Sequence, residues 1–120
     1  MIDFSVSPEM EQILKLTTRF MEKHVYPAER EMTEEGLPQE ILKPLQATVK
    51  ELGLWAPHMP VEVGGMGIGV VGLALMNEII GRSPIGPIIF GCQAPDAGNC
   101  EILHLYGTEE QKQKYLLPNV

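Results

Sequence analysis

Residues 106–116 read YGTEEQKQKYL, and this stretch points most directly to a helical fold. Gly107 stops one helix, and the next begins at once with Thr108 as its N-terminal cap. The Thr108 hydroxyl can accept a hydrogen bond from the amide of Gln111, while the Gln111 side chain reaches back, which is the capping-box arrangement. A short last helix then runs to about Leu116, and Pro118 stops it. The stretch therefore predicts two helices that meet at a tight corner.

The segment before this corner, residues 85–106, is apolar and of helical length, but Pro87 and Pro95 interrupt it. Proline lacks a backbone amide and disfavours helix in the residue before it. We therefore predict two helices that meet near Pro95, with Asp96 available to cap the second. Another apolar helix is predicted over residues 70–80.

The N-terminal half predicts two amphipathic helices. Ser7 can cap the first, which carries an apolar stripe as far as Val25. Pro27 should kink or end this helix, and residues 29–35 should continue as a turn or two that faces solvent.

The second helix of this half is expected within residues 38–52, with Gly53 as its stop. Pro44 leaves two alternatives, because the regular helix either starts there or bends there. The side chains expected to form its buried stripe are Ile41, Leu45, Val49 and Leu52.

Residues 53–67 are too rich in glycine and proline for a helix and are predicted to form an ordered loop. Within it, residues 60–67 follow the pattern Pro-x-x-x-Gly-Gly-x-Gly. Glycines there permit a positive φ and a close approach of the backbone. The pattern is a weak signal for phosphate binding, and no strand precedes it as a dinucleotide-binding fingerprint requires.

No alternating strand pattern and no internal repeat is found. The fold predicted is all-α, a bundle of five to six helices closing around one shared core. Residues 1–120 are long enough for one domain of this kind and too short for a second.

Composition excludes several classes of function. The chain has 9 basic and 16 acidic residues, a net charge of −7, and no dense run of Lys or Arg, so nucleic-acid binding is not expected. The thiols of Cys92 and Cys100 lack metal-binding spacing and suit a reducing compartment, and His24, His58 and His104 are too scattered for a ligand set. No metal site, no membrane span and no secretory leader is predicted, so a cytoplasmic location is expected.

Several segments together, in this order, resemble the N-terminal helical domain of acyl-CoA dehydrogenases. They are Leu52-Gly53-Leu54, the loop of residues 60–67, Asn77-Glu78-Ile79, residues 107–112 and residues 115–118. The chain departs from the family pattern at Val61, where a Glu is usual, and at Val63, where an aromatic residue is usual. Residues 93–99 are similar to a branch of the family associated with long acyl chains.

The resemblance implies a flavoenzyme that removes the α and β hydrogens of an acyl-CoA, with a Glu as base and FAD as hydride acceptor. In the family that Glu belongs to a C-terminal helical domain, and most flavin contacts belong to a middle β domain. Both would lie beyond Val120, so no catalytic residue is assigned and no flavin-contacting residue is identified here. We expect this chain alone to be inactive and to bind no FAD. The resemblance also implies electron-transfer flavoprotein as a partner, and a homo-oligomer.

The resemblance further implies that Phe90, Gly91, Ala94 and Gly98 line the acyl-chain pocket. On a continuous helix, Gly91, Ala94 and Gly98 would share one face and leave a groove for an alkyl chain. The alternative is that these small residues let two helices pack closely, and Pro95 breaks the periodicity. Enlarging Gly91 or Ala94 is expected to shorten the preferred acyl chain.

Two other functions fit a helical domain of this size. One is a stand-alone interaction module without enzymatic activity, which would cover its apolar face by self-association. The other is a small lipid or acyl carrier, which is supported only by the groove predicted at Gly91, Ala94 and Gly98. Trp55 is expected to fill the core under the glycine-rich loop, with a cofactor-facing role left open.

Overall fold

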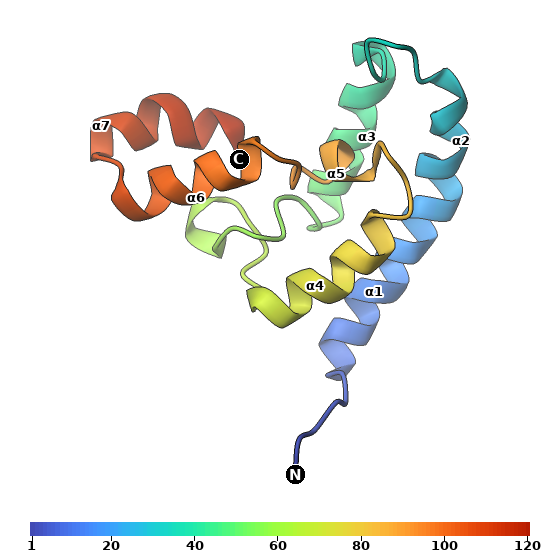
Figure 1. The fold of residues 1–120 in the computed structure, drawn as a ribbon, viewed down its shortest axis with the longest axis horizontal. Coiled ribbons are helices and arrows are strands. Elements are labelled where there is room, and N and C mark those ends of the chain that lie inside the picture. The colour runs from blue at the N-terminus through green and yellow to red at the C-terminus, as the bar shows by residue number, and fades with distance from the viewer.

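The computed structural model describes residues 1–120 and consists of helices and loops (Figure 1). It contains no β-strand, and its only bridge joins Thr33 to Gly36. Six helices are present when the continuous helical rod of α1 and α2 is counted as one, so the predicted all-α bundle of five to six helices is confirmed.

The first helical rod begins with α1 (Pro8–Phe20), and the Ser7 side chain caps it as predicted, accepting from the Met10 amide at 3.1 Å. The chain stays helical through Pro27, where a kink or an end was predicted. A π-helical turn at Met21–Val25 precedes α2 (Tyr26–Ala28) and a 3₁₀ turn at Glu29–Glu31. The wider π turn shifts the hydrogen-bond register just before Pro27, so the proline ring avoids the carbonyl it would otherwise strike.

Helix α3 (Gln39–Glu51) begins before Pro44 and contains it. Gly53, the predicted stop, follows the C-cap residue Leu52 and has a φ of +74°. The buried residues of α3 are Leu42 and Val49, whereas Leu52, predicted to be buried, is exposed. The Gly53 amide donates to the Lys50 carbonyl and the Leu54 amide to the Val49 carbonyl, which is a Schellman end.

The glycine-rich loop is ordered, as predicted, and folds back on itself. A 3₁₀ turn at Val61–Val63 is followed by Gly64, whose φ of +99° is left-handed. The Gly65 amide donates to the Pro60 carbonyl at 3.0 Å, and the Gly67 amide donates to the Met59 carbonyl at 2.9 Å. These bonds close the loop before α4.

Helix α4 (Gly69–Ile80) confirms the helix predicted over residues 70–80. The following apolar segment breaks as predicted, but its first helix, α5 (Gly86–Ile89), is a single turn. Helix α6 (Asp96–Tyr106) then begins after Pro95. Asp96 makes no capping bond because it is already the first helical residue, and its carboxylate accepts from the Gln93 side chain at 3.5 Å instead.

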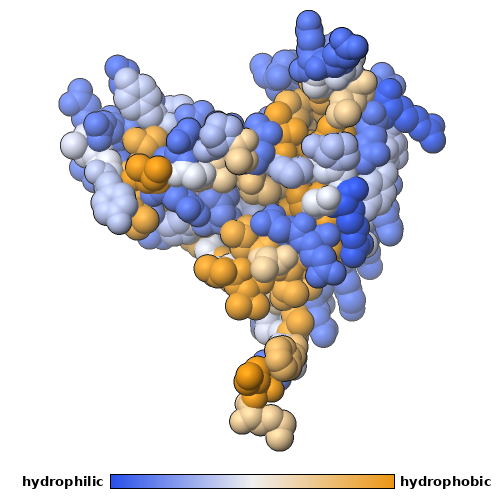
Figure 2. Space-filling model, in the orientation of Figure 1, coloured by the Kyte–Doolittle hydropathy of each residue, from blue (hydrophilic) through white to orange (hydrophobic).

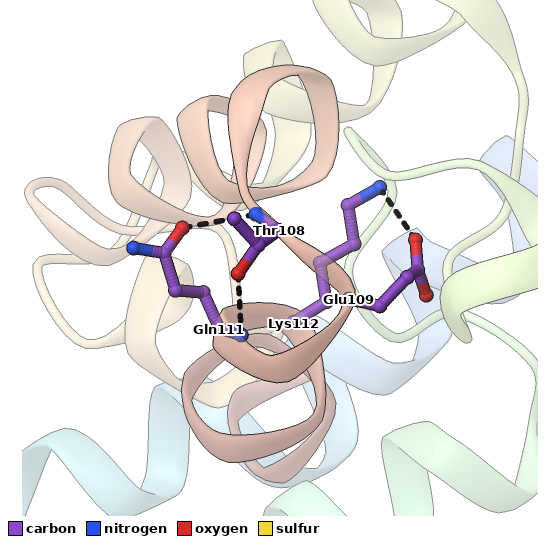
Figure 3. Close-up of polar contacts among 4 residues, drawn as sticks. All are labelled: Thr108, Glu109, Gln111 and Lys112. Atoms are coloured by element: carbon purple, nitrogen blue, oxygen red, sulfur yellow. Dashed lines mark hydrogen bonds and ion pairs between the residues drawn. The ribbon is translucent and has the colours of Figure 1, made fainter.

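The corner after α6 forms the predicted capping box (Figure 3). Thr108 Oγ1 accepts from the Gln111 amide at 3.2 Å, and Gln111 Oε1 accepts from the Thr108 amide at 2.9 Å. Helix α7 (Glu109–Gln111) continues through a π-helical turn at Lys112–Leu116 and a 3₁₀ turn at Leu117–Asn119.

The interior consists of two clusters, so the prediction of one shared core is wrong. The larger cluster contains 13 buried residues, with side chains from α1 to α5. The smaller contains Ala56, Met59, Cys100 and Leu116, and lies where α6 and the C-terminal helical turn meet the loop. Figure 1 shows the reason, since the α6–α7 arm lies beside residues 53–68 and away from α1.

Candidate functional site

The four residues predicted to line an acyl pocket do not lie on one continuous helix. Phe90 is the residue that follows α5, and its side chain is fully buried, edge-on to Phe20 with ring centroids 5.5 Å apart. Gly91 has a φ of +68°, which takes the chain out of the helical conformation. The shared helical face assumed from the spacing therefore does not form. Whether these residues contact an acyl chain stays a prediction.

Ala94 and Gly98 are exposed, one before α6 and the other within it. No atom lies within 4 Å of the position that a Cβ on Gly98 would occupy. Ile102 and Leu105 follow Gly98 at helical spacing on α6, and they are 60% and 67% exposed. The α6 apolar face is here defined as Gly98, Ile102 and Leu105 on α6 together with Ala94, which lies just before the helix. Figure 2 shows apolar atoms on the α6–α7 arm.

Ala94 also lines a shallow surface cavity of about 410 Å³, together with Asn77, Pro87, Cys92 and Gln93. This cavity joins the start of the α6 apolar face to the end of α4. Among the cavities described, only this one is lined both by a predicted pocket residue and by residues of α4.

The largest cavity was not anticipated from the sequence. It measures about 490 Å³ and lies between α1 and the glycine-rich loop. Lys15 and Arg19, four residues apart on α1, border it beside an apolar floor that includes Leu54 and Met66. The spacing of the two cations was the available signal, but only the folded loop supplies the opposite wall.

Neither thiol is suited to nucleophilic chemistry. Burial raises the pKa of Cys92 to about 11, and its Sγ lies 3.8 Å from Asn77 Oδ1. Burial and the nearby Asp96 also raise the pKa of Cys100. Both side chains are therefore neutral at physiological pH and pack as small apolar groups. No cluster of side chains suited to a metal ion is found, and no helix is both long and apolar enough to cross a bilayer.

The pKa of His58 is shifted by its surroundings. Both its ring nitrogens are buried without a hydrogen-bond partner, beside the smaller cluster. Burial lowers the pKa of His58 from 6.5, and the charge of Glu101 on α6 partly opposes the shift. The unfolded chain therefore binds this proton more readily than the folded chain.

Because of this difference, we expect the chain to lose stability as the pH falls through 6.5, and to keep it above that value. Urea unfolding measured on both sides of this pH should show a smaller acid loss for His58→Gln than for the parent. His104→Gln, the same change on α6, serves as the control and should keep the parent's dependence. Equal acid losses in the parent and His58→Gln would contradict the assignment.

Comparison with known proteins places these features in a family. The family model for the acyl-CoA dehydrogenase N-terminal domain matches residues 7–120. Acyl-CoA dehydrogenase family member 11 of Rattus norvegicus is 38% identical, over 96% of this chain and 16% of its own length. The probable acyl-CoA dehydrogenase FadE2 of Mycobacterium tuberculosis is 32% identical, over 98% of this chain and 30% of its own length.

One solved structure is similar to this chain in both fold and sequence. A candidate acyl-CoA dehydrogenase from Mycobacterium abscessus superimposes with a TM-score of 0.87 at 32% identity. The match covers 97% of this chain and 32% of that one, so the chain spans well under half the length of the relatives it matches. The chain belongs to the acyl-CoA dehydrogenase family and corresponds to that family's N-terminal domain.

Proposed function

We propose that this chain is the N-terminal part of a flavin-dependent acyl-CoA dehydrogenase and supplies one wall of its acyl-chain cavity. The observation that carries the proposal is the α6 apolar face, which is open, contains small residues at Ala94 and Gly98, and continues into exposed Ile102 and Leu105. An alkyl chain needs a long apolar surface with room beside it. Phe90 and Gly91 would support this wall from behind.

The role of the chain is binding rather than bond making. When bound, FAD would accept the β hydride of the acyl-CoA. The largest cavity here is an open groove beside Lys15 and Arg19, and no flavin-binding role is assigned to it. We expect, from the family resemblance, that other domains hold the flavin and the catalytic base, and that residues 1–120 form the helical domain alone.

The family also supports proposals about partners. We expect an acyl-CoA substrate, electron-transfer flavoprotein as electron acceptor, and a homo-oligomer in the cytoplasm. The similarity of residues 93–99 to the long-chain branch favours a long acyl group. The alternative function, a stand-alone interaction module, is favoured by a second exposed apolar patch at Val70 and Val71. The module would oxidise no acyl-CoA.

Enlarging the proposed wall tests the enzyme function directly. In the dehydrogenase that carries this domain, Ala94→Leu and Gly98→Leu should lower kcat/KM for the longest accepted acyl-CoA roughly tenfold, because one or two methylenes then lose their space. Short acyl-CoAs should be oxidised almost as before. Gly91 is unsuitable for this test, since a side chain there would strike Trp55.

Val70→Leu is the matched control, because it also enlarges an exposed apolar residue, but on α4. It should leave the chain-length profile unchanged. Unaltered profiles in both Ala94→Leu and Gly98→Leu would refute the proposed wall, and a parent that oxidises no acyl-CoA would refute the enzyme function itself.

A further inference from the structure

Trp55 lies at the junction between the two parts of the interior. It is the only hydrophobic side chain that packs against both the larger and the smaller cluster. Lys50 Nζ lies 4.4 Å from the centre of its ring, which covers one face of the indole with a cation. The ring is therefore held between α3 and the segment that follows α5.

The edge of this ring sets the position of Gly91. A Cβ on Gly91 would lie 2.6–2.8 Å from Cζ2, Cε2 and Cη2 of Trp55, closer than real carbon atoms approach. The φ of +68° at Gly91 is a conformation that residues with a side chain rarely adopt. Backbone and indole are thus in direct contact, with no side chain between them.

Two hydrogen bonds hold the same segment from the same side. Gln46 Nε2 donates to the Ile88 carbonyl at 3.0 Å, and the Ala56 amide donates to the Phe90 carbonyl at 2.9 Å. Residues 88–91 are therefore fixed by α3 and by the residues at and next to Trp55. Within this segment, Gly91 is the residue whose backbone also meets the edge of the indole.

The indole N–H does not explain why a tryptophan is present. Trp55 Nε1 is buried and has no hydrogen-bond partner, which is unfavourable for a buried donor. A phenylalanine would avoid this cost, but its ring is smaller. The contact with Gly91 depends on the size of the indole, which is larger than a phenylalanine ring.

A short segment of chain connects Gly91 to Ala94 in the proposed acyl wall. Only two residues separate Gly91 from Ala94, and the Gln93 carbonyl accepts from the Ala97 amide in the first turn of α6 at 2.9 Å. Trp55, Gly91, Gln93 and Asp96 also line one cleft of about 240 Å³. Because the connection is this short, we expect a displacement of Gly91 to move Ala94.

We propose that Trp55 is a positioning residue that sets the depth of the acyl-chain cavity, by holding Gly91, and through it Ala94, forward against the substrate. This inference rests on the proposed function. A smaller ring lets residues 91–94 move back toward α3, and the cavity becomes deeper. The substrate class affected is the longer or bulkier acyl-CoA thioesters.

The test is the chain-length profile of the dehydrogenase that carries this domain, with Trp55→Phe and Trp55→Leu. Both variants should raise kcat/KM for acyl-CoAs just beyond the parent's limit relative to shorter ones, by roughly tenfold for one added methylene. The shift should be larger for Trp55→Leu. If that variant proves too unstable to assay, Trp55→Phe alone decides.

Leu42→Val is the control, because it removes volume from the larger cluster on α3 and has no part in the contact with Gly91. It should lower stability and leave the profile unchanged. An active parent with the same profile in Trp55→Phe and Trp55→Leu would overturn this inference and leave the proposed function standing. A parent inactive on every acyl-CoA would overturn both.

Discussion

Replacing Gly65 by alanine is expected to lower the free energy of unfolding by about 3 kcal/mol, which places it among the most damaging single-methyl additions in the chain. The Gly65 backbone packs directly on Met59, and an added Cβ would overlap the Met59 carbonyl oxygen and lie 2.5 Å from the carbonyl carbon. These are backbone atoms, so no side chain can rotate away. The loop must shift, and the bond from the Gly67 amide to the Met59 carbonyl would be strained with it.

Urea unfolding followed by the fluorescence of Trp55, the only tryptophan, measures this loss. Gly98→Ala is the control, because it adds the same methyl group to a helical glycine with open space around it. That change should be neutral or should stabilise the chain by up to about 1 kcal/mol, as expected for alanine in a helix. A loss below about 1 kcal/mol for Gly65→Ala would show that the loop absorbs the methyl group.

The glycine-rich loop shows how far the sequence could be interpreted. Its composition correctly predicted an ordered loop that needs positive φ values and close backbone contact. It did not reveal which glycine serves which purpose. Gly64 and Gly67 have positive φ, whereas Gly65 does not and is required for its contact with Met59. That distinction depends on the path of the loop, which local composition does not determine.

Local signals were the reliable ones. The caps at Ser7 and Thr108 were predicted and are present, because a cap depends only on residues within one turn. The helical course through Pro27 was missed, since it depends on a π turn that no residue preference announces. The division into two clusters was missed as well, because it depends on where the α6–α7 arm packs.

The prediction of the candidate site was also accurate only where it depended on local sequence. Ala94 and Gly98 were selected by helical spacing and do lie at the surface, but the spacing assumed that the helix runs unbroken from Phe90. The left-handed conformation of Gly91 separates the two ends of the motif. As a result, the Phe90 ring points into the larger cluster, while Ala94 and Gly98 face outward.

Phe90→Ala is therefore expected to cost about 3–5 kcal/mol of stability, the range for removing a fully buried aromatic side chain. The ring is 0% exposed and meets Phe20 in an edge-to-face contact, and the nearby backbone is fixed by the Ala56 amide. Little collapse of the cavity is expected. Urea unfolding of the chain measures the loss, with Leu105→Ala, an exposed apolar truncation on α6, as a control expected to stay within about 0.5 kcal/mol.

A double-mutant cycle shows whether Phe90 stabilises the fold through its contact with Phe20 in the larger cluster. The aromatic contact should give Phe20→Ala and Phe90→Ala a coupling of about 0.5–1.5 kcal/mol. If Phe90 instead lined the acyl cavity, its truncation would cost little stability, would show no coupling to Phe20 and would lengthen the accepted acyl chain. The core role predicts a large loss of stability with coupling to Phe20, and the cavity role predicts a changed acyl-chain length with little loss of stability. The two sets of results are opposite, because a ring that is fully buried in the larger cluster cannot also contact the substrate.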